Sequence, residues 1–185
     1  MQHVKVPQDR IGVLIGEGGE TMREIERRAE VRLDIDSENH SVRIEDVSDG
    51  DPVRALKTPD IVRAIGRGFP PEDALRLLEN DMMMFETVDI QQAARNKNDL
   101  KRQKGRLIGK EGRTRELFEE LTGAAVVVYG TTLGVIGMPK QVDVVRSAAE
   151  MLLDGAPHGA VYSFLERKRR EELKHQGMEY HPYTG

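Results

Sequence analysis

The stretch Leu107-Ile108-Gly109-Lys110-Glu111-Gly112-Arg113 is the most informative part of this sequence. Its two glycines stand three positions apart, so the backbone can turn tightly and approach a ligand without a Cβ in the way. A helical pattern follows directly, and the free N–H groups and positive dipole end of that helix would face the loop. With Lys110, Arg113 and Arg115 close by, this arrangement predicts a site for phosphate groups.

A second copy of the glycine motif lies earlier in the chain, at Ile15-Gly16-Glu17-Gly18-Gly19. Gly16 corresponds to Gly109, an offset of 93 residues. In both copies, apolar residues at helical spacing follow the glycines, and two segments of strand-like pattern come next. Each half therefore reads strand, helix, glycine loop, helix, strand, strand, helix, with opening strands predicted at His3–Val6 and Met84–Asp89.

Nucleotide-binding loops are the main alternative for a glycine motif before a helix. A Walker loop needs four residues between its first glycine and the Gly-Lys pair, and a Ser or Thr after the lysine. Here only three residues separate Gly105 from Gly109-Lys110, and Glu111 replaces the hydroxyl residue. Neither loop has the Gly-x-Gly-x-x-Gly spacing of a dinucleotide fold. Two glycine loops in the same element order instead indicate a repeated module.

Further helices are predicted between the halves and at the end of the chain. Asp51-Pro52 and Pro70-Pro71 are helix starts, and Thr58-Pro59 predicts another, with an N-cap followed by proline at the first helical position. A basic helix is predicted over Ala160–Lys174. The aromatic pair in the tail segment Tyr180–Tyr183 could stack on bases or have no binding role.

Charge is distributed unevenly along the 185 residues. The net charge is −4, yet residues 1–90 hold 12 Lys+Arg against 20 Asp+Glu, whereas residues 91–185 hold 16 against 12. Within Arg95–Arg115 nine basic residues face two acidic ones. Because attraction to phosphate depends on local charge, the second half is the better candidate for binding nucleic acid. A solvated helix face is the alternative interpretation of the basic run.

Composition argues against several classes of protein. The chain has no cysteine, which excludes disulfides, thiolate zinc sites and cysteine nucleophiles. Its longest apolar run, Ala124–Tyr129, is too short for a membrane span, and its start is not that of a signal peptide. The five histidines show neither metal-ligand spacing nor an acid–base constellation, although His158 lies in a predicted turn that could approach RNA. We expect a cytoplasmic protein that is not an enzyme and holds no metal or cofactor.

The repeated arrangement resembles the KH domain, whose Gly-x-x-Gly loop clamps about four nucleotides of single-stranded nucleic acid. The resemblance implies an α+β fold of two tandem type I KH domains, each a three-stranded sheet with helices packed on one face. We expect domain 1 over residues 1–81, including the extra helices, and domain 2 over residues 82–185, including the C-terminal helix and tail. Leu107, Ile108 and the strand Val126–Val128 would line a groove that reads bases, or serve the core.

The two loops differ in charge. Glu17 and Gly18 fill the variable positions of the first loop, where KH domains usually offer a basic residue, and Glu20 and Glu24 follow at once. Carboxylates suit the start of a helix but repel phosphate. We interpret the first domain as mainly structural or protein-binding, and the second as the RNA-binding one.

A narrower resemblance rests on Gly109-Lys110-Glu111-Gly112-Arg113-Thr114-Arg115, which is similar to the loop of archaeal two-KH proteins related to eukaryotic Partner of Nob One. Arg115 stands where most KH domains have an apolar residue. Further matching segments are Ala64–Phe69, Pro71-Glu72, Ile136-Gly137, Arg146, Ala148 and Leu152–Tyr162. Pro59 departs from the family, whose helix would be continuous there.

This resemblance implies a function in ribosome assembly. The protein would bind single-stranded RNA near the 3′ end of small-subunit ribosomal RNA and assist its maturation, alongside a PIN-domain endonuclease. Two alternatives stay open: a scaffold that docks proteins and no longer holds RNA, and a regulator of other RNAs. The oligomeric state is left open.

The candidate RNA-binding residues surround the second loop, with weaker candidates in the first loop and on the preceding helix. The main set is Lys104, Arg106, Ile108, Gly109, Lys110, Glu111, Gly112, Arg113, Thr114 and Arg115. The weaker set is Gly16, Gly18, Gly19, Lys101 and Arg102.

Overall fold

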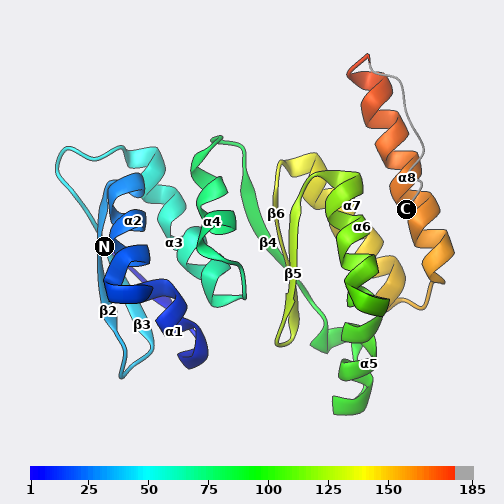
Figure 1. Cartoon of the computed structure of the whole chain (residues 1–185), viewed down its shortest axis with the longest axis horizontal. Coiled ribbons are helices and arrows are strands. Elements are labelled where there is room, and N and C mark those ends of the chain that lie inside the picture. Colours follow the sequence, from blue (N-terminus) through cyan, green and yellow to red (C-terminus); the bar gives the residue numbers. More distant parts are fainter. Residues whose placement is uncertain (178–185) are drawn as a thin grey trace. The chain divides into compact units, whose positions relative to one another are not determined.

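The computed structural model describes residues 1–177, so the tail segment with Tyr180 and Tyr183 lies outside the described residues. The chain forms two compact units, Met1–Phe85 and Glu86–Gly185 (Figure 1). None of the helices in the described part combines the length and the apolar character needed to cross a membrane.

The first unit follows the predicted element order. Its strands and helices are β1 (Gln2–Lys5), α1 (Gln8–Ile15), α2 (Glu20–Ala29), β2 (Val31–Asp36), β3 (Ser41–Asp46), α3 (Pro52–Gly66) and α4 (Pro71–Ala74). Short 3₁₀ turns cover Glu17–Gly19 and Leu75–Leu78. Strand β1 begins and ends one residue earlier than predicted, although the Val6 N–H still donates to the His40 carbonyl at 2.9 Å.

The sheet of the first unit has the order β1-β3-β2, with both strand pairs antiparallel. Val31 and Leu33 are buried, whereas Arg32 and Asp34 between them are exposed, as the alternating pattern predicts for a half-buried strand. Helix α2 packs against β2, and α3 packs against β1 and β3. Ile25 of α2 is fully buried in this core.

Helix α3 corrects the predicted helix start at Thr58-Pro59. The helix runs without a break from Pro52 to Gly66, with Pro59 in its interior. Proline removes one backbone donor from a helix. The Thr58 hydroxyl donates to the Arg54 carbonyl at 3.0 Å, so this side chain bonds within the helix and does not cap a new one. The predicted start at Asp51-Pro52 is confirmed, because the Asp51 carboxylate accepts from the Val53 N–H at 2.9 Å.

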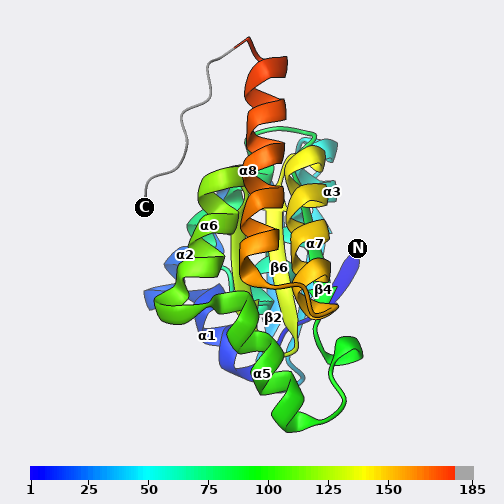
Figure 2. The same cartoon turned by 90° about the vertical axis from the view of Figure 1, so that its right-hand side faces the viewer.

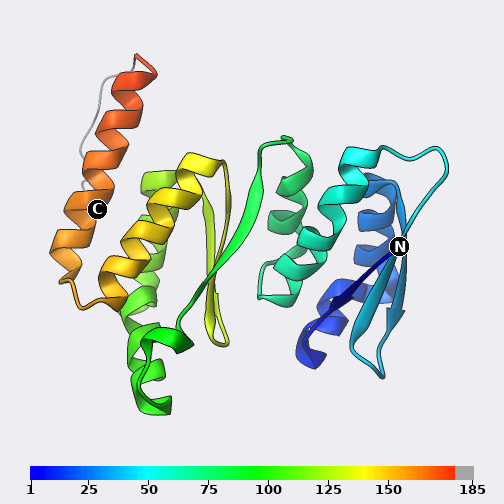
Figure 3. The same ribbon diagram turned by 180° about the vertical axis from the view of Figure 1, so that it is seen from behind.

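The second unit repeats the order and adds a helix. Its strands and helices are β4 (Met84–Asp89), α5 (Lys97–Ile108), α6 (Arg113–Thr122), β5 (Ala125–Tyr129), β6 (Thr132–Gly137), α7 (Pro139–Leu153) and α8 (His158–His175). Short 3₁₀ turns cover Gln91–Ala93 and Lys110–Gly112. The sheet has the order β4-β6-β5, and Figure 3 shows β4 beside β6.

Helices α6 and α7 cover the second sheet, with α6 against β5 and α7 against β6. Phe118 of α6, Val135 of β6 and Val145 of α7 are fully buried, at the positions that the helical and strand patterns predict. Helix α8 packs on α6 and α7 through the buried Val161 and Leu165. Its second half extends past the ends of both helices (Figure 2).

Candidate nucleic-acid interface

The second glycine loop has a backbone shape that only a few residues allow. Helix α5 ends at Ile108, and Gly109 follows with φ 78°. A Cβ on Gly109 would lie 2.2 Å from the Thr114 hydroxyl oxygen, so no other residue fits there. Glu111 and Gly112 are also left-handed, with φ 55° and 76°, and α6 begins at the next residue. Glu111 is strained in this region, where a non-glycine residue is uncommon.

The start of α6 is open to a ligand. No side chain caps the helix at Gly112, although the N–H of its first residue, Arg113, donates to the Lys110 carbonyl. Lys110 and Glu111 are exposed, and nothing lies within 4 Å of the position that a Cβ on Gly112 would take. An anion can therefore approach the backbone donors and the positive end of the helix dipole.

The first glycine loop has nearly the same shape. Gly16, Gly18 and Gly19 take φ values of 74°, 58° and 79°, and a Cβ on Gly16 would lie 2.3 Å from the Thr21 hydroxyl oxygen. The two loops differ in charge. Glu17 and Glu20 occupy the positions that Lys110 and Arg113 occupy in the second loop. Shape alone therefore does not distinguish the two loops.

Helix α8 supports the second loop from behind. Thr114 is fully buried, and its hydroxyl is hydrogen bonded to the Tyr162 hydroxyl at 2.8 Å. The His158 Nε2 lies 3.0 Å from the Arg106 carbonyl oxygen, just before the loop. These contacts tie both sides of the loop to α8. In the first unit, the Thr21 hydroxyl has no comparable partner among the described residues.

Sequence reasoning missed this support. Tyr162 and His158 lie about fifty residues from their partners, and neither belongs to a motif whose spacing indicates the contact. His158 was expected in a turn that could approach RNA, but it is the first residue of α8. Only the packing of α8 on α6 brings these two residues to the loop, and no local sequence pattern indicates that packing.

Arg106 has a structural role. Its guanidinium donates to the Leu152 carbonyl and, at 2.6 Å, to the Ala156 carbonyl, where α7 ends. A cation is favourable at the C-terminal end of a helix, and the Leu152 carbonyl there also accepts from the Gly155 N–H at 3.1 Å. Among the main candidate residues, Arg106 is the one whose charged group is bonded at the C-terminal end of α7. Its side chain therefore points away from the second loop's open side.

Arg113 and Arg115 both meet carboxylates of α6. The Arg115 guanidinium pairs with Glu119, which lies one turn further along the helix. Arg113 lies 3.7 Å from the Glu116 carboxylate and 4.0 Å from that of Glu120, and its side chain is partly exposed. The tighter pair leaves Arg115 less available to RNA, whereas Arg113 adjoins Gly112 at the open start of the helix.

Lysines carry the positive charge that is not compensated. Among residues 1–177, the side chains of Lys101, Lys104 and Lys110 form no hydrogen bond or ion pair. Lys110 and Lys101 are exposed and Lys104 is half-buried. An unpaired ammonium group on a flexible stem can reach a phosphate without first breaking an internal contact.

The expected groove is only partly accessible. Leu107 is fully buried and Val126 nearly so, and both therefore belong to the core. Ile108, directly before the loop, and Val127 and Val128 of β5 are half-buried and keep some exposed surface. This agrees with a narrow apolar strip next to the phosphate-binding backbone, onto which unstacked bases can pack.

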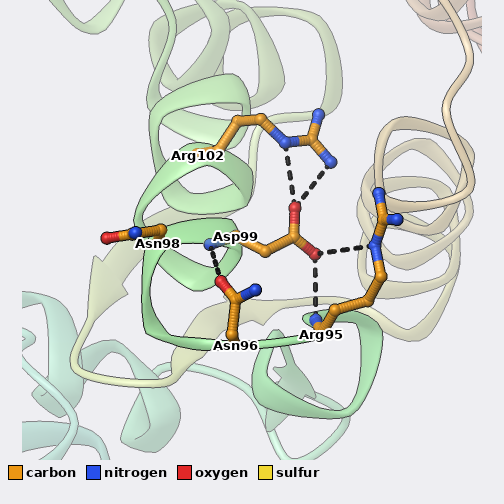
Figure 4. A pocket seen from close by; sticks show the side chains of 5 residues that line it. All are labelled: Arg95, Asn96, Asn98, Asp99 and Arg102. Carbon is orange, nitrogen blue, oxygen red and sulfur yellow. Dashed lines mark hydrogen bonds and ion pairs between the residues drawn. The ribbon is translucent and has the colours of Figure 1, made fainter.

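A hollow lies at the start of α5, lined by Arg95, Asn96, Asn98, Asp99 and Arg102 (Figure 4). Asn96 caps the helix by accepting from the Asp99 N–H at 2.9 Å. The Arg95 N–H and the Arg102 guanidinium both donate to the Asp99 carboxylate, and these bonds hold the pKa of Asp99 below its usual value. The two arginines are therefore paired with a carboxylate that stays charged.

Comparison with known proteins agrees with this geometry. Residues 84–170 match the model of the eukaryotic-type KH domain, type I, and residues 1–66 match the KH domain model. The predicted α+β fold of two type I KH domains is thereby confirmed.

Two archaeal relatives, one of them solved in two structures, span most of the chain. A KH domain-containing protein of Methanocaldococcus jannaschii is 45% identical over 91% of this chain and 74% of its own length. Dim2p of Pyrococcus horikoshii, solved by crystallography, is 46% identical over 90% of this chain and 98% of that one, with a TM-score of 0.84. Its structure in complex with a/eIF2alpha and rRNA superposes with a TM-score of 0.87 at 44% identity.

Eukaryotic relatives are more distant and longer. The pre-rRNA-processing protein PNO1 of Eremothecium gossypii is 28% identical over 75% of this chain, which spans 52% of that protein's length. The names of these relatives describe RNA binding and pre-rRNA processing, in agreement with the prediction of a binding protein and not an enzyme. With two KH domains and these relatives along nearly its whole length, the chain belongs to the two-KH-domain family that includes archaeal Dim2p and eukaryotic PNO1.

Proposed function

We propose that this protein binds single-stranded RNA through its second glycine loop and acts in assembly of the small ribosomal subunit, near the 3′ end of the small-subunit rRNA. One observation carries the binding proposal. The start of α6, which no side chain caps, follows the loop Gly109–Gly112, and within residues 1–177 the side chains of Lys101, Lys104 and Lys110 form no hydrogen bond or ion pair. Backbone donors, a helix dipole and free ammonium groups together suit phosphate.

The relatives support the choice of RNA. Dim2p of Pyrococcus horikoshii has been crystallised with rRNA, and PNO1 is a pre-rRNA-processing protein. We extend this to a PIN-domain endonuclease as a partner, because maturation of a 3′ end needs a nuclease, and the described residues contain no group of three or more His, Asp or Glu that could hold a metal ion. In this proposal the protein positions the RNA and the nuclease cleaves it.

A second candidate function concerns the first unit. Its glycine loop keeps the KH shape but carries Glu17, with Glu20 and Glu24 in the following helix. Such a loop repels phosphate, so its exposed surface suits a protein partner better than RNA. The complex of Dim2p with a/eIF2alpha shows that a relative assembles with a protein as well as with rRNA.

Crosslinking in cells tests the proposed RNA target. The protein is crosslinked to RNA by ultraviolet light in its native host, and the bound fragments are sequenced. We expect fragments concentrated near the 3′ end of the small-subunit rRNA precursor, and a loss of this enrichment when Lys110 and Glu111 are both replaced by aspartate. Fragments spread over unrelated transcripts would instead support a general RNA regulator.

A further inference from the structure

A single row of lysines runs along α5 to the second loop. Lys97, Lys101 and Lys104 are four and three positions apart, and Ile108 continues the row four positions later. Residues at this spacing lie on one face of a helix. The last lysine, Lys104, lies five residues before Gly109, the first residue of the loop that we propose binds phosphate.

None of these lysines has an internal role. Within residues 1–177, the side chains of Lys97, Lys101 and Lys104 form no hydrogen bond or ion pair. Other lysines of the same unit do, since Lys140 lies 3.9 Å from a Glu172 carboxylate oxygen and Lys168 lies 3.5 Å from one of Glu171. Like charges along one helix face repel each other, which makes an unpaired row unfavourable unless an anion lies against it.

The surroundings of the row leave room for a ligand. Gly105 stands next to Lys101 and Lys104 on the helix surface, is exposed, and has nothing within 4 Å of the position of an added Cβ. The guanidinium of Arg102, which follows Lys101 in the helix, is paired with Asp99 (Figure 4). The lysines are therefore the uncompensated cations of this helix face.

We propose that the α5 lysine row binds the phosphates of an RNA strand that continues beyond the nucleotides held by the second loop. This inference rests on the proposed function. The three lysines extend over about 10 Å at 1.5 Å per residue, which carries phosphate contacts beyond the roughly four nucleotides that a KH loop clamps. Because α5 lies on one side of the loop, its lysines contact the RNA beyond only one end of the nucleotides that the loop holds. They position the strand and do not read bases.

Length-dependent RNA binding tests this inference on the full-length protein. The probe is a fluorescent RNA of about six nucleotides from the 3′ end of the host small-subunit rRNA, used alone or extended by about four uridines at its 5′ or its 3′ end. We expect the intact protein to gain affinity with one extension only. In the variant Lys97→Ala this gain is reduced, while the affinity for the short RNA changes less than about twofold. On the extended RNA, the salt slope falls by about 0.7, the contribution of one phosphate contact on a single strand.

A matched control removes one lysine that is already paired. The variant Lys140→Ala has the same change in net charge and should keep the gain. The inference is overturned if neither extension raises affinity, if both extensions raise it equally, if the α5 variant keeps the gain, or if the control loses as much. Failure of the intact protein to bind the short RNA would instead contradict the proposed function itself.

Discussion

Gly105 and Gly12 occupy equivalent positions in the middle of α5 and α1, four residues before each glycine loop. Neither has a left-handed backbone, and nothing lies within 4 Å of an added Cβ at either position. Glycine in a helix interior destabilises a protein by about 0.5–1 kcal/mol relative to alanine. The folded protein itself does not require these glycines. An RNA strand that passes close to the helix backbone would explain a glycine at position 105, because Gly105 lies beside the unpaired lysines.

Substitution of these two glycines separates stability from binding. Gly12→Ala and Gly105→Ala should each raise the free energy of unfolding by about 0.5–1 kcal/mol. Only Gly105→Ala should also weaken RNA binding, because its methyl group would stand in the path of the strand. Denaturant unfolding and RNA titration of both variants check this. Unchanged RNA affinity in Gly105→Ala would show that no ligand approaches this helix face closely.

The two arginines at the start of α6 should respond differently to alanine. Arg115 is paired with Glu119, so Arg115→Ala should lower stability by up to about 1 kcal/mol, the usual upper value for an exposed pair. Arg113→Ala should weaken binding of all RNA sequences and reduce the salt slope by roughly one contact. Titrations at several salt concentrations, combined with thermal melts, measure both effects. A salt slope that falls only in Arg115→Ala would mean that the roles are reversed.

Among the helices and strands, the sequence predicted those features that a pattern within one segment indicates. The glycine repeat, the apolar spacing of α6 and α7 and the alternation in β2 identify the order of strands and helices, because each signal lies within one segment. The helix start at Thr58 was wrong, since a proline after a hydroxyl residue has the same local pattern inside a helix as at its start. The contacts of α8 with the second loop stayed hidden, because they join residues about fifty positions apart.

The hydrogen bond between Thr114 and Tyr162 is expected to stabilise the second loop as a unit with α8. Thr114→Val and Tyr162→Phe should each lower stability by about 1 kcal/mol, and the double variant should lose less than the sum of the two. Both single variants should also weaken RNA binding, since Thr114 contacts the loop at Gly109. Unfolding curves for all variants give the coupling energy. Strictly additive losses would show that the two hydroxyl groups do not act together.

At the scale of the whole chain, charge separates the two halves. Residues 1–90 hold 12 basic and 20 acidic residues, and residues 91–185 hold 16 and 12. Repulsion among the acidic groups destabilises the compact state, whereas phosphate attraction needs the basic half. Salt screens both effects. The same change in ionic strength should therefore act on stability and on RNA binding in opposite directions.

Salt dependence tests this separation. We expect the melting temperature to rise from low to molar potassium chloride while RNA affinity falls over the same range. An uncharged osmolyte at equal osmolality serves as the control for general solvent effects. A melting temperature that stays flat or falls with salt would remove the idea that repulsion in the acidic half limits stability.

We propose that the second glycine loop binds RNA and that the first does not. The most direct measurement is titration of a single-stranded RNA from the 3′ end of small-subunit rRNA with two loop variants. Lys110→Asp/Glu111→Asp should lose most of the affinity with nearly unchanged melting temperature, and Glu17→Asp/Gly18→Asp should keep it, since that loop is already acidic. Full RNA binding by the folded second-loop variant, or an equal loss in both variants, would contradict the account.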